Sequence, residues 1–237
     1  LLATVGTRSP EDGARNPLWL VDVADPAAPR DLGPLRDADG RALATARDVT
    51  VVGARAYVAA WVNGLWIVDF ENLDDPARLD YEVVGHHTYA PFLRTVNSPA
   101  PGTHNAWPSA DGTKLWVTDE LVGEGVRVFD ISDPANPVLL DFFNLGPRAL
   151  PHNVVVQDDL AYLSHYLDGL RVLQLVNGEI VEIAARDTVG NHARFNPYRG
   201  AWGVFPLENH VLVGDTFGGL LVFEKGPALQ TPSAKGV

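Results

Sequence analysis

Short runs of apolar residues, separated by turn-forming residues, recur along the whole chain. The clearest copies begin at Leu18 (LWLVDVADPAAP), Leu65 (LWIVDFENLDDP) and Val126 (VRVFDISDPANP), and degenerate copies begin at Leu170 (LRVLQLVNG) and Leu220 (LLVFEKG). Val, Ile, Leu, Tyr and Trp fill the runs, and Gly, Asp, Asn and Pro separate them, which predicts short strands joined by turns. Since no ten-residue window shows a convincing 3.6-residue period, we expect almost no helix.

Each of these runs is the third strand of a repeated unit of four, which we name A to D in chain order. Predicted A strands begin near residues 47, 104, 152 and 200, and predicted B strands near 56, 114, 161 and 210. Successive C strands start 44 to 61 residues apart. A four-stranded repeat of this length is typical of a β-propeller blade. The strand at 65–70 is apolar on both faces, as expected where neighbouring blades cover both sides. A β-sandwich is the alternative architecture, but it does not explain the repeat.

The sequence therefore predicts an all-β protein, a β-propeller of four-stranded antiparallel blades. One domain is expected over residues 1–226, and 227–237 are expected to form a tail or linker. About five blades can be traced, the first lacking strand A and the last lacking strand D. We expect residues upstream of Leu1, or a partner, to complete the ring.

The turns that follow the C strands share an Asp-Pro pair. Pro26, Pro76 and Pro134 preset the backbone for a turn. The preceding aspartates can accept backbone N–H bonds there, as can those that end the C strands. These residues are Asp25, Asp75 and Asp133 in the turns, and Asp22, Asp69 and Asp130 at the strand ends.

Charge and composition remove several classes of function. The net charge of −12 argues against nucleic-acid and anionic-lipid partners, which need a basic face. With no Cys, the chain has no disulfide, thiol nucleophile or Cys-based metal site. No apolar run reaches the length of a membrane span, so no transmembrane segment is predicted. Motifs for a serine nucleophile elbow and for nucleotide binding are absent, and we assign no catalytic residue.

The repeated segments resemble the LVIVD-repeat family of β-propellers. The stretch from His104 to Glu224 is similar, more narrowly, to the proteins called choice-of-anchor B, through HNAWPSADGTKLWVTDE, VRVFDISDP, HNVVVQDDLAYLSHYLDGLRVL, GAWGVFPLE and GGLLVFE. The resemblance implies an extracellular, cell-surface or periplasmic location and no established reaction. In the fourth blade the segment LRVLQLVNGE departs from the pattern, because it lacks the Asp-Pro turn.

In an antiparallel blade, the start of strand A and the end of strand B lie at the same end, and A lines the central channel. Six of the seven histidines map to this face, with His86, His87 and His192 placed in long D-to-A loops and His210 alone at the opposite end. The candidate binding-face residues are His104, Asn105, Asp119, Glu120, His152, Asn153, His165, Tyr166, Asp215 and Arg199.

Three interpretations of this face stay open. His104, His152, His165 and Asp119 could hold a divalent metal ion, because imidazole and carboxylate suit zinc, iron, copper or manganese. A metal-bound water could then act as a nucleophile, with Glu120 or Asp119 as base. The face could instead form a ligand pocket without metal, or each His-Asn pair could cap the entry to strand A.

Two long inserts, 82–103 and 186–199, carry aromatic residues on the same face: Tyr89, Phe92, Phe195 and Tyr198. Long loops on a rigid scaffold are common binding sites, although these could also only plug the channel mouth. We expect a non-catalytic binding or scaffold module that holds a protein or cell-surface component, for example as a subunit of a larger surface or periplasmic assembly. The alternative is a metal-dependent hydrolase or lactonase with its site at the channel mouth.

Overall fold

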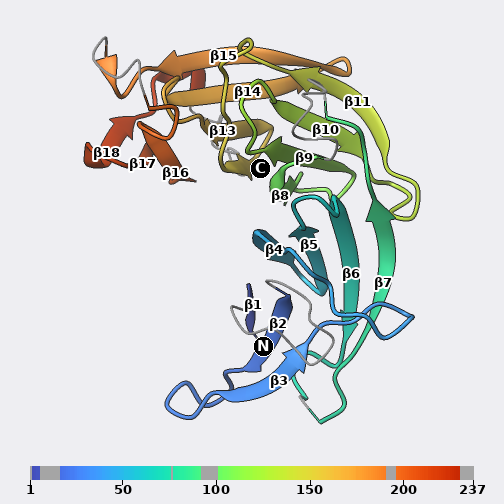
Figure 1. Ribbon diagram of the computed structural model, residues 1–237. Helices are drawn as coiled ribbons and strands as arrows, with labels where there is room; N and C mark the ends of the chain where they lie inside the picture. The colour runs from blue at the N-terminus through green and yellow to red at the C-terminus, as the bar shows by residue number, and fades with distance from the viewer. Residues whose placement is uncertain (1, 6–16, 76, 92–100, 191–195, 230–237) are drawn as a thin grey trace, which may run out of the picture.

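Five antiparallel sheets follow one another around the axis on which a closed propeller has its central channel, in the computed structural model, which describes residues 2–5, 17–75, 77–91, 101–190 and 196–229. Figure 1 shows the sheets as blades of an arc, with β1–β3 at one end and β16–β18 at the other; the ring is not closed over the described residues. The outer rim carries the strands β3, β7, β11 and β15. The chain is therefore all-β and of the propeller class, as predicted.

Three blades have four strands, and the two at the ends have three. Blade 1 consists of β1 (Leu2–Val5), β2 (Leu18–Asp22) and β3 (Arg30–Pro34). Blade 2 consists of β4 (Asp48–Val52), β5 (Arg55–Ala59), β6 (Leu65–Glu71) and β7 (Asp80–His87). Blade 3 consists of β8 (Thr103–Pro108), β9 (Lys114–Asp119), β10 (Val126–Asp130) and β11 (Val138–Phe143). Blade 4 consists of β12 (Val154–Gln157), β13 (Leu160–Ser164), β14 (Leu170–Val176) and β15 (Glu179–Arg186). Blade 5 consists of β16 (Ala201–Pro206), β17 (His210–Asp215) and β18 (Gly219–Glu224).

This division confirms the strand assignment from the repeats, including a first unit without strand A and a last unit without strand D. Within the described residues, helix is limited to one 3-10 turn, Pro227–Leu229. No described helix has the length and apolar character that crossing a membrane requires.

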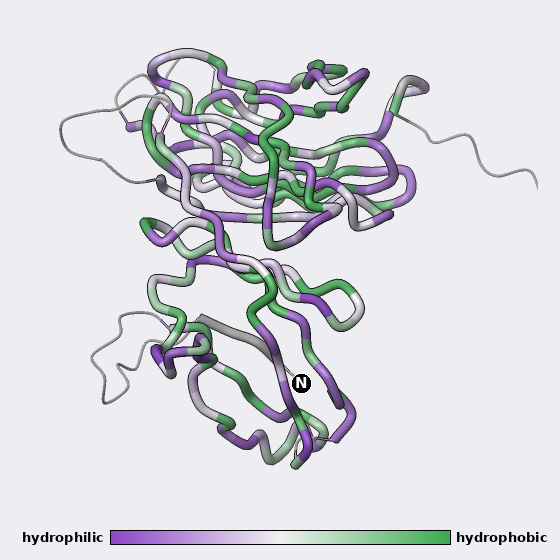
Figure 2. The backbone as a smooth tube through the Cα atoms, turned by 90° about the vertical axis from the view of Figure 1, so that its right-hand side faces the viewer, coloured by the Kyte–Doolittle hydropathy of each residue, from purple (hydrophilic) through white to green (hydrophobic). Residues whose placement is uncertain are grey.

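The core lies between the blades, where four apolar clusters fill the four blade-to-blade interfaces. Blade 4 shows how one strand pair serves two neighbours. Ala161 and Leu173 pair across β13 and β14 and pack toward blade 3, whereas the adjacent pair, Tyr162 and Val172, packs toward blade 5. Figure 2 shows short hydrophobic and hydrophilic stretches alternating along the backbone. Burial on both sides therefore explains the apolar residues on both faces of the C strands in blades 2, 3 and 4, whereas Leu220 and Val222 of β18, in the end blade, are exposed.

Three of the C-to-D turns share the same geometry because an aspartate shapes each of them, as the sequence predicted. Asp25, Asp75 and Asp133 each accept a backbone N–H bond from the residue two positions later. The aspartates at the ends of the C strands pair with basic residues on a neighbouring strand. These contacts are Asp22–Arg30, Asp69–Arg55 and Asp130–Lys114.

His86 and His87 are the last residues of β7, so their predicted placement in a loop is wrong. The His86 ring stacks on Trp66 at 3.7 Å between ring centroids, and its Nε2 atom lies 3.0 Å from the Asn63 carbonyl oxygen. His87 packs beside Phe129 and Tyr89. Stacking on strand neighbours prolongs the strand past the point where its apolar pattern ends. His192, Phe92 and Phe195 lie outside the described residues.

Hydrogen bonds between innermost strands tie blades 2, 3 and 4 together beside the channel. The buried Asn105 donates from Nδ2 to Asp48 of β4 at 2.7 Å. Its Oδ1 accepts the backbone N–H of Val154 in β12 at 3.0 Å. One side chain therefore joins three blades at the end of the molecule where the candidate residues gather.

We predict that Asn105→Ala lowers the free energy of unfolding by about 1–3 kcal/mol, because it leaves the buried Val154 N–H without its acceptor. Urea unfolding followed by fluorescence measures the change. Asn136→Ala is the control: its side chain bonds to Asp133 at the surface, and its loss should cost less than about 0.5 kcal/mol. Equal effects for the two variants would contradict the role of Asn105.

Candidate metal centre at the channel mouth

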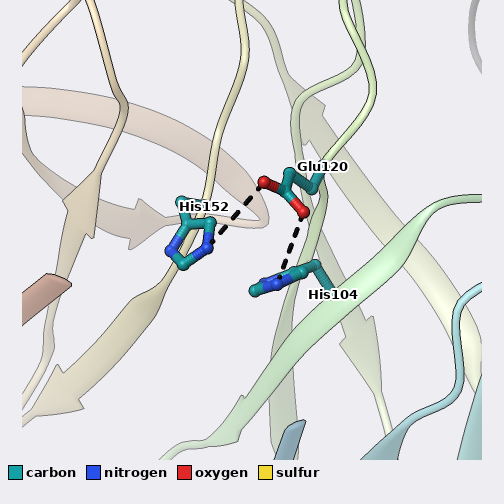
Figure 3. Close-up of side chains that lie close together, drawn as sticks. All are labelled: His104, Glu120 and His152. Atoms are coloured by element: carbon teal, nitrogen blue, oxygen red, sulfur yellow. Dashed lines mark ion pairs between the residues drawn. The ribbon is translucent and has the colours of Figure 1, made fainter. Parts of the chain in front are cut away.

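Three side chains from two blades converge at the channel mouth: His104 of β8, Glu120 directly after β9, and His152 shortly before β12. Figure 3 shows both imidazole rings directed at the carboxylate of Glu120. The Nε2 atom of His104 lies 3.4 Å from Glu120 Oε2, and that of His152 lies 3.9 Å from Oε1. All three ligand atoms lie within 4.8 Å of one another.

The sheet register explains how residues sixteen positions apart meet. Thr103 pairs with Asp119, so β8 begins where β9 ends. The register then shifts between Thr103 and Asn105, which leaves His104 unpaired in a bulge. A bulge changes the direction of the extra residue, here toward the neighbouring Glu120. The same shift occurs between Ala201 and Gly203 of β16, around Trp202.

Other groups hold the three side chains in position. The Nδ1 atom of His152 lies 2.5 Å from the Trp202 carbonyl oxygen. A hydrogen bond to this oxygen requires the ring proton on Nδ1, so the Nε2 atom carries a lone pair that faces Glu120. The Tyr166 hydroxyl donates to Glu120 Oε1 at 2.6 Å. Tyr166 has a φ of 36°, a left-handed conformation that costs an L-residue energy and is often found at functional sites.

Burial decides the protonation of the rings. Burial is the largest cause of the low pKa of His104, which is about 4, although nearby Asp48 acts to raise it. Burial, aided by the neighbouring His104, also lowers the pKa of His152 to about 4. Burial and the bond to Glu120 raise the pKa of Tyr166, so its phenol stays a donor. At neutral pH both imidazoles are therefore uncharged, so their contacts with Glu120 are not ion pairs.

Of the four residues that the sequence suggested as metal ligands, this group contains His104 and His152 but not Asp119 or His165. Asp119 is fully buried, and its two oxygens contact Arg127 and the Tyr89 hydroxyl. The Nδ1 atom of His165 lies 3.0 Å from Asp168 in the next turn, without hydrogen-bond alignment. Alternation along β9 turns Asp119 into the blade, and Glu120 takes the position beside the histidines.

The other candidate residues have contacts of different kinds. Asn105 joins three blades, as described above, and Asn153 lies beside the ring of His104. Asp215 accepts the N–H groups of Phe217 and Gly218 and so shapes a turn of blade 5. Arg199 stacks on the ring of Phe217 at 4.2 Å.

Sequence reasoning placed Glu120 among the binding-face residues and the candidate bases, but not among the metal ligands, and it missed Trp202. The signal for Glu120 is its position directly after strand β9, at the end of the blade where the candidate residues gather. The sequence gives no signal for the contact with Trp202, because the group that accepts the hydrogen bond from His152 is the backbone carbonyl of Trp202 and not its side chain.

A family model for the LVIVD repeat matches residues 44–78 and 121–144, which cover most of blade 2 and part of blade 3. The chain carries LVIVD repeats. No curated protein matches the chain. The narrower resemblance to choice-of-anchor B proteins stays a prediction.

Solved structures similar to this chain include three bacterial proteins. A candidate 6-phosphogluconolactonase from Bacteroides uniformis superposes with a TM-score of 0.62 at 17% identity, over 97% of this chain and 65% of that protein. PorZ, a surface component of the type-IX secretion system of Porphyromonas gingivalis, gives 0.56 at 11%, over 92% and 30%. AztD from Citrobacter koseri, in its apo form, gives 0.50 at 13%, over 87% and 53%. These likenesses show the fold alone, and the chain spans less than two thirds of each relative.

We predict that acid destabilises the metal-free protein through His104 and His152. Their pKa values are about 4 when folded and near 6.5 when exposed, so the unfolded chain binds more protons between these values. Above about pH 6.5 the free energy of unfolding has its full value. It decreases as the pH falls toward 4, by up to about 3 kcal/mol for each ring.

Urea unfolding at pH 7.5 and pH 5, with chelator present, measures this loss. The double variant His104→Gln/His152→Gln should lose less stability between the two pH values than the wild-type protein. His210→Gln is the control, because His210 is exposed at the opposite end of the blades. Parallel losses in the double variant and the wild type would rule out this origin.

Proposed function

We propose that this LVIVD propeller is an exported, non-catalytic binding or scaffold module that holds a protein or cell-surface component at its channel face. The observation that carries the proposal is a set of exposed aromatic side chains beside the candidate metal centre. We call Tyr198, Trp202, Phe217 and Arg199 the aromatic rim. The three aromatic residues are 53%, 54% and 67% exposed.

Contacts between rings connect the rim to the residues of the channel mouth. Tyr198 meets Tyr166 edge-on, with ring centroids 5.6 Å apart, and Trp202 lies 5.0 Å from His152. Arg199 covers one face of Phe217 at 4.2 Å. Fixed neighbours lower the entropy that these side chains would lose on binding, which favours a preorganised contact surface.

The composition of the rim suits a macromolecular partner. Trp, Tyr and Arg are the residues enriched among the energetic centres of protein interfaces. Exposed aromatic groups that adjoin one another mark an interaction site more often than scattered apolar residues do. The export of the protein and its place in a surface or periplasmic assembly rest on the resemblance to choice-of-anchor B proteins.

The same geometry argues for binding over hydrolysis. A metal-dependent hydrolase or lactonase of the kind that the sequence suggested would use Glu120 or Asp119 as the base beside the metal-bound water. Asp119 is engaged by Arg127 inside the blade, and Glu120 is one of the three groups that face the centre. Both bases suggested by the sequence therefore have other contacts. A candidate lactonase among the relatives supplies a similar fold at 17% identity and no site residue.

We predict that the double variant Tyr198→Ala/Trp202→Ala loses most binding of its partner and keeps its stability within about 0.5 kcal/mol per site, because both side chains are more than half exposed. Affinity capture from the cell-envelope and secreted fractions of the native host, quantified by mass spectrometry, measures partner retention. Fractionation of the host tests the predicted export.

The matched control is Val138→Ser/Leu139→Ser, which changes two residues of β11 that are equally exposed and lie away from the channel face. The control should retain the partners that the rim variant loses. Identical partner sets for the wild type, the rim variant and the control would refute the proposal.

A further inference from the structure

We propose that His104, His152 and Glu120 bind one divalent first-row transition-metal ion, such as Zn²⁺, at the channel mouth. This inference does not depend on the function proposed for the aromatic rim. It rests on the donor atoms, on the groups that orient them and on two buried polar atoms that lack partners.

The donors match such an ion in kind and spacing. Zn²⁺ binds imidazole nitrogen and carboxylate oxygen at about 2.0–2.2 Å, which places the donors of a tetrahedral site roughly 3.3–3.5 Å apart. The separation of His104 Nε2 and Glu120 Oε2 is 3.4 Å, and that of His152 Nε2 and Glu120 Oε1 is 3.9 Å. The two distances end on different oxygens of Glu120, and the three ligand atoms lie within 4.8 Å of one another, so side-chain rotations would have to bring the donors to the spacing of one ion.

The surroundings resemble the second layer of a metal site. Histidines that bind metal usually donate their other ring N–H to a carbonyl or carboxylate, which fixes the tautomer. His152 has this contact, from Nδ1 to the Trp202 carbonyl, and the same carbonyl accepts from Ser164 Oγ at 2.9 Å. A ligating carboxylate is held in the same way, and Tyr166 supplies that bond to Glu120.

Two buried polar atoms without hydrogen-bond partners indicate a tautomer of His104 with its proton on Nδ1, as in His152. Among the described residues, the buried Nδ1 of His104 and the buried Oδ1 of Asn153 have no hydrogen-bond partner. They are a complementary donor and acceptor, and the Asn153 side chain already interacts with this ring. A metal ion on Nε2 would fix the proton on Nδ1, so that it could bond to Asn153.

The donor set also selects the class of ion. Ca²⁺ and Mg²⁺ prefer oxygen ligands throughout, whereas two imidazoles and a carboxylate suit zinc, cobalt, nickel, copper, iron and manganese. Three protein ligands leave one tetrahedral position for water or for a group from a partner.

Titration of chelator-stripped protein with Co²⁺ and Zn²⁺ tests the site. We expect one ion per chain, with visible Co²⁺ bands of nitrogen and oxygen ligation. Metal affinity should fall by about 100-fold or more in each of the ligand variants His104→Gln, His152→Gln and Glu120→Gln. Loss of a hydrogen-bond partner of a ligand already lowers metal affinity by ~10–100-fold, and loss of the ligand itself should lower it further. His165→Gln and His210→Gln should bind as the wild type does.

A measurement on the unmodified protein covers the case in which a ligand variant fails to fold. Saturating Zn²⁺ should protect His104 and His152 from diethylpyrocarbonate and leave His210 reactive, as mass spectrometry would show. Absence of stoichiometric binding, unchanged affinity in all three ligand variants, or protection of other histidines alone would overturn the proposal. The capture experiment on the rim uses different variants, so either proposal can fail alone.

Tyr166→Phe tests the second layer. Removing the hydroxyl should weaken Zn²⁺ binding by about 10-fold and leave the fold intact, because the ring and its packing remain. A purely structural hydroxyl would change the unfolding midpoint of the metal-free protein without changing metal affinity. That result would assign Tyr166 to the scaffold.

Discussion

Packing of aliphatic side chains between successive blades is the interaction on which the other features depend. A single three- or four-stranded sheet cannot bury both of its faces, so each blade is stable only against its neighbours. Burial from both sides explains the apolar residues on both faces of the C strands in blades 2, 3 and 4, each of which has a neighbour on either side. The same stacking brings β8 and β12, which belong to different blades, next to each other. The contact between His104 and His152, at 4.2 Å between ring centroids, is therefore a consequence of blade packing.

The fold could be predicted from the sequence because its determinants are local and repeated. Leu65 and Val126 begin copies of one pattern, and the aspartates after each copy form their turns with neighbours two residues away. Where the pattern is supplemented by tertiary contacts, the prediction failed. His86 and His87 have no strand signal of their own, and stacking on Trp66 and packing against Phe129 keep them in β7.

The candidate centre could be predicted only in part. Strand order placed the histidines at one end, because A starts where B ends. Sequence could not say which of Asp119 and Glu120 faces the channel, since this depends on the bulge at His104 and on a buried partner for Asp119. Arg127 provides that partner from the adjacent β10. The carbonyl of Trp202 and the positive φ of Tyr166 are backbone features, and no residue pattern specifies them.

The repeated His-Asn pairs posed a choice between capping and binding, and in blade 3 the geometry divides these roles within the pair. In blade 3, Asn105 takes the structural role, with hydrogen bonds to blades 2 and 4, while the bulge turns His104 toward Glu120. In blade 2 the same two positions hold Arg47 and Asp48, and Asp48 is the acceptor for Asn105. In these two blades the second position joins blades, whereas the first position holds Arg47 in blade 2 and His104 in blade 3. A repeat protein can change the residue at such a position without weakening its core, and this is how one propeller comes to have imidazoles at two adjacent blades.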